Sequence, residues 1–334
     1  MRLLSLFSGM AGMDAGFSEQ VVVRQESVPE SYVDAPADTP GFVALKRLPF
    51  STVFQNDILP CAKAIADWNG WSHNYVLRDI RELLTEDYAF PAADVIVGGF
   101  PCQDFSHAGK RAGLESARGT LYQSYVEVVR RVRPIVFVAE NVNGLLTMTG
   151  SPINAIVADF AAVGYEVKYQ LIKCEEHGIP QTRWRVIIMG LRLDAKTAEH
   201  GENWNVIPPS LQQCHVRPYF AHLLEPSVAS DPAQQVYSKA AKLEKGQGQS
   251  QVPMDGFGPT MRAEHHGNIE FRGERRLTVR EAALLQTFPP DCILTQPGKK
   301  ATLTAYKPIG NAVPPLLGYI IAQRVLQLLP ANPC

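Results

Sequence analysis

Short apolar runs alternate with amphipathic, helix-like stretches along the chain. The runs occupy residues 3–7, 51–57, 95–97, 135–139 and 185–191, and the helical patterns occupy 11–19, 121–131, 153–162, 278–287 and 313–329. Apolar runs of this length, bounded by turn residues, are typical of fully buried strands. Strands that alternate with helices form parallel sheets with helices on both faces. The sequence therefore predicts an α/β fold with a doubly wound, mostly parallel sheet.

Two tracts interrupt this alternation. Residues 24–49 are rich in Pro, Asp and Ser, which predicts an irregular loop or insertion. After Leu193 the chain becomes polar and rich in Pro and Gln. We therefore expect two domains, the larger formed by residues 1–192 plus 304–330 and the smaller, loop-rich one formed by residues 193–303.

The charge balance limits how this chain can meet a polyanion. Its 334 residues include 32 Lys plus Arg and 33 Asp plus Glu, which gives a net charge of -1. Because there is no excess of positive charge, any face that binds nucleic acid must be local. The basic stretch 261–281 is the candidate, and it holds Arg262, Arg272, Arg275, Arg276, Arg280, His265 and His266. A solvated charged surface is the alternative interpretation.

The remaining composition excludes other classes. The six cysteines show neither Cys-x-x-Cys nor Cys/His spacing, so we expect reduced thiols and no metal site. No apolar run reaches the ~18 residues of a membrane span, and the first residues lack a signal-peptide cleavage pattern. We expect a cytoplasmic protein with no membrane partner.

The stretch LFSGMAGMDAGF places spaced glycines between a strand and a helix. Such a loop brings backbone amides close to a nucleotide-like ligand. An ordinary turn, a dinucleotide site and an adenosylmethionine site all fit this pattern. Asp57 and Asp79 each follow an apolar run, where a carboxylate reaches ribose hydroxyls or an adenine amine, although either residue also suits a helix cap.

Two further stretches place reactive groups at strand ends. In VIVGGFPCQDFS, Cys102 follows a strand on a loop at the carboxyl end of the sheet, where open α/β folds bind ligands. In IVFVAENVNGL, Glu140 ends the next strand and points into the same crevice, where desolvation favours a shared or held proton. An inert core thiol is the alternative for Cys102, and a helix cap or a salt bridge for Glu140.

The stretch GIPQTRWRVIIMG alternates two arginines with a tryptophan. On a strand, Arg183 and Arg185 lie on the same side. Two guanidinium groups side by side hold a phosphate or a polarised carbonyl oxygen. A charge pair on an edge strand is the alternative.

The order of these stretches is more specific than any one of them. FSGMAG, PCQ, ENV, QTRWR, RRLTVREAALLQTFP and GNAVPP follow one another along the chain. In this order the sequence closely resembles the cytosine-5 DNA methyltransferases of bacterial or phage type, except near residues 24–49 and 193–257. The resemblance implies methyl transfer from S-adenosyl-L-methionine to carbon 5 of a flipped-out cytosine in a short, specific duplex DNA sequence, within a restriction–modification system.

The resemblance also assigns roles to individual residues. It implies that Cys102 is the nucleophile, that Glu140 faces the ring nitrogen of the cytosine, and that Arg185, with Arg183 close by, holds the carbonyl oxygen and phosphates. The implied contacts to S-adenosyl-L-methionine are Phe7, Gly9, Gly12, Asp57, Ile58, Asp79, Ile80, Pro101, Leu121, Asn311 and Val313. The larger domain is then the catalytic and cofactor-binding domain, and the smaller one the target recognition domain.

Two departures from the family accompany these assignments. Ala11 stands where the family has the first of two glycines, so we expect a helical rather than a left-handed backbone there. The insertion before Asn56 is also longer than the usual link. The alternatives to a DNA methyltransferase are a transfer-RNA methyltransferase of the same superfamily and a catalytically silent DNA-binding regulator. We expect a monomer that acts on double-stranded DNA, with a restriction endonuclease as a functional rather than physical partner.

Overall fold

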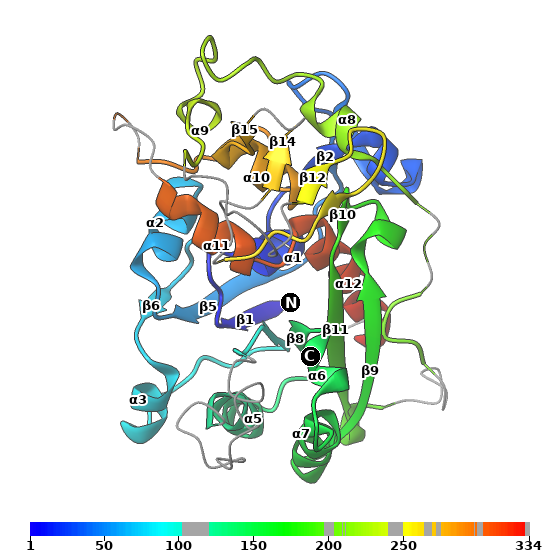
Figure 1. Ribbon diagram of the computed structural model, residues 1–334. Helices are drawn as coiled ribbons and strands as arrows, with labels where there is room; N and C mark the ends of the chain where they lie inside the picture. Colours follow the sequence, from blue (N-terminus) through cyan, green and yellow to red (C-terminus); the bar gives the residue numbers. More distant parts are fainter. Residues whose placement is uncertain are drawn as a thin grey trace.

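The chain folds into a seven-stranded sheet covered by helices, with a smaller group of short helices and strands above it (Figure 1). The computed structural model describes residues 1–101, 120–196, 204–208, 210, 212–239, 250–263, 269–271, 275–296, 298 and 303–330. Within these ranges no helix is long and apolar enough to cross a membrane.

The central sheet is mostly parallel, as predicted. Its strands, in spatial order, are β6 (Tyr75–Leu77), β5 (Ser51–Asp57), β1 (Arg2–Leu6), β7 (Val95–Gly98), β8 (Val136–Val142), β11 (Trp184–Arg192) and β9 (Tyr165–Lys173). The pairings from β6 to β8 are parallel, and β11 is antiparallel to both of its neighbours. The parallel strands therefore all end at the same edge of the sheet.

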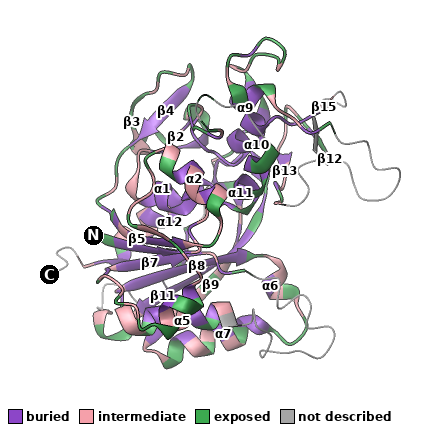
Figure 2. Cartoon of the chain, turned by 90° about the vertical axis from the view of Figure 1, so that its left-hand side faces the viewer, coloured by how far each residue is buried: buried purple, intermediate pink, exposed green. Residues whose placement is uncertain are grey.

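Helices cover both faces of this sheet (Figure 2). Alternate residues of β7 divide between the faces, since Val95 and Val97 pack with one hydrophobic cluster and Ile96 with another. The first cluster contains residues of α1 (Gly12–Ser18) and α12 (Pro315–Leu328), and the second contains residues of α3 (Ile80–Thr85), α5 (Thr120–Val132) and α7 (Pro152–Ala162). The expected α/β architecture is confirmed.

The tract that was expected to be an irregular loop forms a small sheet instead. Strands β2 (Val22–Arg24), β4 (Phe42–Leu45) and β3 (Val33–Pro36) pair antiparallel in that order, with β4 in the middle. The prediction was wrong because the strands have only three or four residues each, too few to show a period among the surrounding Pro and Asp residues. We call this three-stranded sheet the brace sheet.

A second group of elements lies above the central sheet. It comprises α8 (Val216–Phe220), α9 (Pro232–Gln235), α10 (Val279–Leu285), β10 (Gln181–Thr182), β12 (Ser250–Val252), β13 (Gly258–Pro259), β14 (Ile269–Phe271) and β15 (Arg275–Arg276). We call α8, α9, α10 and the strands β12 to β15 the α10 unit. Thr278 caps α10 and forms a reciprocal capping box with Glu281. The hydrophobic cluster around α10 also takes in Met10 and residues of α2 (Pro60–Trp68) and α11 (Tyr306–Asn311).

Candidate active site

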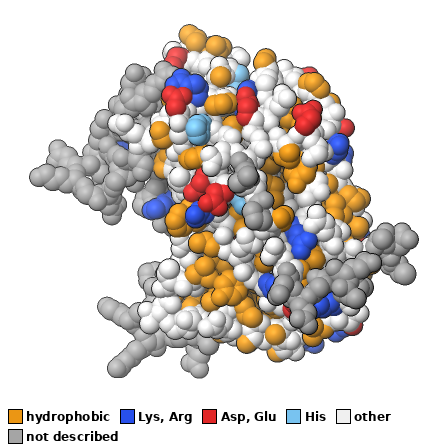
Figure 3. Space-filling model, turned by 90° about the vertical axis from the view of Figure 1, so that its right-hand side faces the viewer, with side chains coloured by type: hydrophobic (Ala, Val, Ile, Leu, Met, Phe, Trp, Pro, Cys, Tyr) orange, Lys and Arg blue, Asp and Glu red, His pale blue; other side chains and the backbone are white. Residues whose placement is uncertain are grey.

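The carboxyl ends of the parallel strands gather most of the predicted site residues. Leu6 at the end of β1 pairs with Gly98 of β7, which pairs in turn with Ala139 of β8. The loop after β1, residues 99–101 after β7 and the ENV residues of β8 consequently lie side by side at this edge of the sheet. From the right-hand side of Figure 1, the surface is hollowed between the part with the α10 unit and the part with α5 and α7 (Figure 3).

The loop after β1 has an unusual backbone. Phe7, Gly9 and Ala11 all adopt positive φ angles, of 53°, 55° and 64°. The expectation of a helical backbone at Ala11 was therefore wrong. Ala11 is the N-cap of α1, and its amide donates to the Ser8 carbonyl at 2.9 Å. This tight turn imposes a left-handed conformation, which disfavours a residue with a Cβ atom by roughly 1 kcal/mol.

Gly12 brings α1 against the C-terminal motif. A Cβ atom at Gly12 would lie 2.3 Å from the carbonyl oxygen of Val313. Only a glycine permits this approach, because no Cβ sits so close to a backbone atom. Gly12 and Val313, both predicted cofactor residues, are thus brought together, while Asn311 beside them is exposed.

Asp57 organises the same loop through backbone hydrogen bonds. Its Oδ2 accepts from the Gly9 amide at 2.8 Å, and its Oδ1 accepts from the amides of Ile58 and Leu59 at 2.7 and 2.9 Å. Burial raises the pKa of Asp57, and these amide donors oppose that rise. The next side chain, Ile58, is 61% exposed. A carboxylate beside an exposed apolar side chain fits a ribose next to an adenine.

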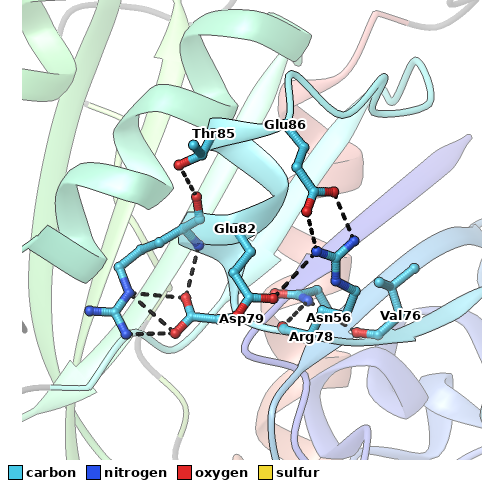
Figure 4. Close-up of polar contacts among 8 residues, drawn as sticks. Asn56, Val76, Arg78, Asp79, Glu82, Thr85 and Glu86 are labelled. Carbon is cyan, nitrogen blue, oxygen red and sulfur yellow. Dashed lines mark hydrogen bonds and ion pairs between the residues drawn. The ribbon is translucent and has the colours of Figure 1, made fainter.

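Asp79 occupies a different setting (Figure 4). It caps α3 by accepting from the Arg81 amide at 2.9 Å, and it pairs with the Arg81 guanidinium at 2.6 Å. These Arg81 contacts lower the pKa of Asp79. Asn56 positions the neighbouring β6 by donating to the carbonyls of Val76 and Arg78. The alternative interpretation, a helix cap, therefore describes Asp79, and the buried side chain of Ile80 belongs to the core.

Cys102 lies outside the described residues. The residues that lead to it, up to Pro101, are described. A Cβ atom at Gly99 would lie 2.9 Å from Glu140 Oε2. Asn141 Nδ2 donates to the Phe100 carbonyl at 3.0 Å. The last residues before Pro101 and Cys102 are therefore held against the ENV motif.

Glu140 and Arg185 form a buried ion pair. Arg185 Nε lies 2.7 Å from Glu140 Oε1, and each side chain is 10% exposed. The contact is not aligned as a hydrogen bond, and among the described residues Oε1 has no hydrogen-bond partner. Glu140 therefore retains the capacity to bind a donor or a proton from a ligand.

Arg183 serves another purpose than its neighbour. Its guanidinium donates to the carbonyls of Met261, Gly310 and Ala312 at 2.9 to 3.3 Å. Burial lowers its pKa to about 9, which still leaves it charged at neutral pH. The structure thus gives Arg183 a clamping role between β11, the α10 unit and the C-terminal motif, rather than the expected contact with substrate.

Most of the described arginines of the basic stretch 261–281 also point inward. Arg275 pairs with Glu281 through two hydrogen bonds of 2.8 Å, Arg280 pairs with Asp231 at 2.6 Å, and Arg276 is buried. Arg275 and Arg280 hold α10 through these ion pairs, and the three inward side chains do not form the predicted nucleic-acid face. Arg272, His265 and His266 lie outside the described residues.

Two buried glutamines were missed in the sequence. Gln181 Nε2 donates to the Leu285 carbonyl and to Gln286 Oε1, both at 2.9 Å. Gln286 Nε2 donates to the carbonyls of Ile309 and Ala312. Their positions inside QTRWR and ALLQTF were the available signal, since a polar residue in an apolar run indicates a buried hydrogen bond.

The comparisons with known proteins cover nearly the whole chain. The family model described as C-5 cytosine-specific DNA methylase matches residues 1–251 and 230–327. Type II methyltransferase M.BsuRI of Bacillus subtilis is 30% identical over 97% of this chain and 79% of its own length. M.BspRI of Lysinibacillus sphaericus is 31% identical over 97% and 81%. The fold also matches the solved Dnmt2 methyltransferase of S. pombe, with a TM-score of 0.66 and 18% identity over 98% of each chain.

Proposed function

The chain belongs to the C-5 cytosine-specific DNA methylase family and is a DNA cytosine-5 methyltransferase, and from this premise we propose how its own residues carry out the reaction. We propose that Cys102 attacks a cytosine flipped out of a short, specific duplex DNA sequence, because neither face of a stacked base is accessible. The observation that most supports this is the placement of Glu140 against Gly99, three residues before Cys102.

The chemistry follows from the low nucleophilicity of carbon 5 in an aromatic ring. The Cys102 thiolate forms a bond to carbon 6, and the electron pair of the carbon 5–carbon 6 double bond moves to carbon 5. A proton shared between Glu140 and ring nitrogen 3 passes to nitrogen 3 as negative charge develops in the ring, and Arg185 stabilises the Glu140 carboxylate that is left. After methylation, a water molecule acts as the base that takes the proton from carbon 5. The electron pair of that C–H bond restores the double bond and expels the Cys102 thiolate, and the proton on nitrogen 3 returns to the Glu140 carboxylate.

The family implies a methyl donor, and we propose S-adenosyl-L-methionine, which supplies an electrophilic methyl group on a sulfonium. The open space beside Gly9 leaves room for its methionine part, Gly12 holds α1 against Val313, and the Asp57 carboxylate suits its ribose hydroxyls. Phe7, Ile58, Pro101, Leu121, Asn311 and Val313 complete the proposed site, while Asp79 caps α3 and Ile80 packs in the core beside it. The fit rests on the loop geometry around Asp57.

The wider setting is also part of the proposal. We propose a catalytic and cofactor-binding domain at 1–192 plus 304–330 and a target recognition domain at 193–303. The Type II names of the relatives support a restriction–modification system with a separate endonuclease. We further propose a monomer of the cytoplasm, since one chain contains all the motifs.

A trapping experiment tests the covalent route. Duplex DNA with 5-fluorocytosine at the target should form an adduct with the wild-type protein that survives a denaturing gel, because fluorine blocks the elimination step. The Cys102→Ser variant should form none and should transfer no tritiated methyl groups. Cys61→Ser, at a half-buried thiol on α2, is the matched control and should behave as wild type. Normal turnover by the Cys102 variant would exclude this residue, and methylation of transfer RNA in place of duplex DNA would favour the alternative substrate.

A further inference from the structure

The middle strand of the brace sheet lies between two hydrophobic clusters. All four residues of β4 are buried, although the strand belongs to a surface insertion. Phe42 packs in the cluster of the α10 unit, whereas Val43 and Leu45 pack in the cluster of α1, α12 and the central sheet. Because side chains alternate along a strand, β4 joins the two clusters through its opposite faces.

On one face, the brace sheet contacts the segment by which the chain enters the α10 unit. The Phe42 ring meets the rings of Tyr219 and His222 edge-on, at 5.8 and 5.2 Å. The hydroxyls of Ser27 and Tyr219 lie 2.8 Å apart, and Gln212 Nε2 donates to the Glu26 carbonyl at 2.7 Å. These contacts fix both ends of residues 212–222, which we call the entry segment.

On the other face, the brace sheet is anchored to the last helix of the central fold. The Tyr319 hydroxyl on α12 donates to the Lys46 carbonyl at 3.1 Å, directly after β4. The Tyr32 and Tyr319 rings also meet edge-on at 5.5 Å. The brace sheet is thus held firmly by the body that carries the candidate active site.

Arg24 of β2 contacts Phe42 on the neighbouring strand. Its guanidinium lies 5.3 Å from the centre of the Phe42 ring, pairs with Glu26 at 2.8 Å and donates to the Pro40 carbonyl at 3.0 Å. Phe42 is therefore held between Arg24 on its own sheet and Tyr219 of the entry segment.

The entry segment needs such support because its own structure is short. Helix α8 has only five residues, and a helix this short is not stable without tertiary contacts. Its position must consequently be fixed by what it packs against. Phe42 and Ser27 supply that contact from outside the α10 unit.

We propose that the brace sheet positions the α10 unit for DNA binding, with Phe42 as its main positioning residue. The proposal rests on the proposed function, because it assigns the α10 unit to the DNA. A unit that is ordered beforehand loses less entropy on binding. Loosening it should therefore weaken DNA binding and leave methyl transfer from the bound state unchanged, which appears as a higher KM at constant kcat.

The test compares two neighbouring substitutions on opposite faces of β4. Phe42→Ala removes the contact with Tyr219, and Val43→Ala, the matched control, removes core volume on the face toward α12. Hydrogen exchange should accelerate across 212–222 in Phe42→Ala, with β1 and β7 unchanged. KM for duplex DNA should rise about fivefold or more, the scale of a coupling between two sites, at unchanged kcat and cofactor affinity. Val43→Ala should show neither effect.

Other outcomes would overturn either the positioning role of the brace sheet or the proposed function, and the two cases can be told apart. Equal exchange across 212–222 in Phe42→Ala and wild type overturns the positioning role, and so does a fall in kcat without a rise in KM. If Phe42→Ala does not fold, Phe42→Leu and Tyr219→Phe replace it, with the same two readouts expected in weaker form. Hydrogen exchange can be measured whether or not the protein methylates DNA, so it tests the positioning role alone. A wild-type protein that does not methylate DNA, but whose Phe42 variant loosens the entry segment, would refute the proposed function alone.

Discussion

Replacing Asp14 with Asn should stabilise the protein by an amount that grows as pH rises from 3.8 to about 6. Asp14 lies on α1 with 2% of its surface exposed. Its Oδ1 accepts from Gln55 Nε2 at 2.9 Å, and among the described residues its Oδ2 has no hydrogen-bond partner. Burial raises the pKa of this carboxyl from 3.8 to about 6, although the Gln55 hydrogen bond opposes the rise. At a pH between these two values, the Asp14 carboxyl of the folded protein therefore holds a proton that the unfolded chain has released.

The sign and size of the effect follow from this difference. Between pH 3.8 and about 6 the folded state binds more protons than the unfolded state, so the free energy of unfolding falls as pH rises. A difference of about two pH units at about 1.4 kcal/mol per unit gives a loss of about 3 kcal/mol, complete above pH ~7. Asn resembles the protonated carboxyl in shape and places a similar donor at the Oδ2 position. It should match wild type near pH 4 and exceed it by about 3 kcal/mol near pH 7.5.

Urea unfolding of both proteins from pH 4 to pH 8 measures this difference. Subtracting the two curves removes the titration of all other groups, so the difference should grow as pH rises from 3.8 to about 6 and then level off. Asp87→Asn, at a side chain that is 92% exposed, is the control and should show a flat difference. A flat difference for Asp14→Asn, or a variant less stable than wild type at pH 7.5, would refute the role of burial.

Three substitutions probe the site itself. Gly99→Ala places a methyl group 2.9 Å from Glu140 Oε2 and should lower kcat about a hundredfold with DNA affinity retained, as steady-state kinetics would show. Arg183→Lys keeps the charge but cannot reach all three carbonyls, and should lower the free energy of unfolding by about 2 kcal/mol in urea. Asp57→Asn exchanges an acceptor for a donor facing the Gly9 amide, and should weaken S-adenosyl-L-methionine binding at least about tenfold by calorimetry. Unchanged values would contradict each argument in turn.

The central sheet could be predicted because its signal is local. Each parallel strand is a short apolar run followed by turn residues, and the order of runs and helices dictates a parallel sheet whatever the loops do. The brace sheet gave no such signal. Phe42 and Val43 are adjacent in the sequence yet belong to different hydrophobic clusters, so a strand buried on both sides resembles any four apolar residues in a loop.

In the candidate site, too, features set by local sequence could be predicted and those set by distant contacts could not. The placement of Glu140 and Asp57 near the carboxyl ends of buried strands could be predicted, because each follows an apolar run in the sequence. The role of Arg183 was not predictable, since its acceptors lie 78 to 129 residues away in the sequence. Two arginines spaced by one residue share a side of a strand, but the spacing does not tell which partner each will meet. In the structure Arg185 pairs with the Glu140 carboxylate, whereas Arg183 donates to backbone carbonyls.

The glycines of the motifs show that one residue type can have more than one structural reason. Gly12 has no need of a left-handed backbone, whereas Ala11 adopts one despite its Cβ atom. What Gly12 supplies is the missing side chain opposite Val313, and Gly99 supplies the same opposite Glu140. A close approach between distant segments and a special dihedral angle both select glycine, so the sequence alone cannot separate them. At Gly12 and Gly99 the close approach is the reason for glycine, because each lies directly against another segment of the site. The left-handed conformation of the turn falls on Ala11, which is not a glycine.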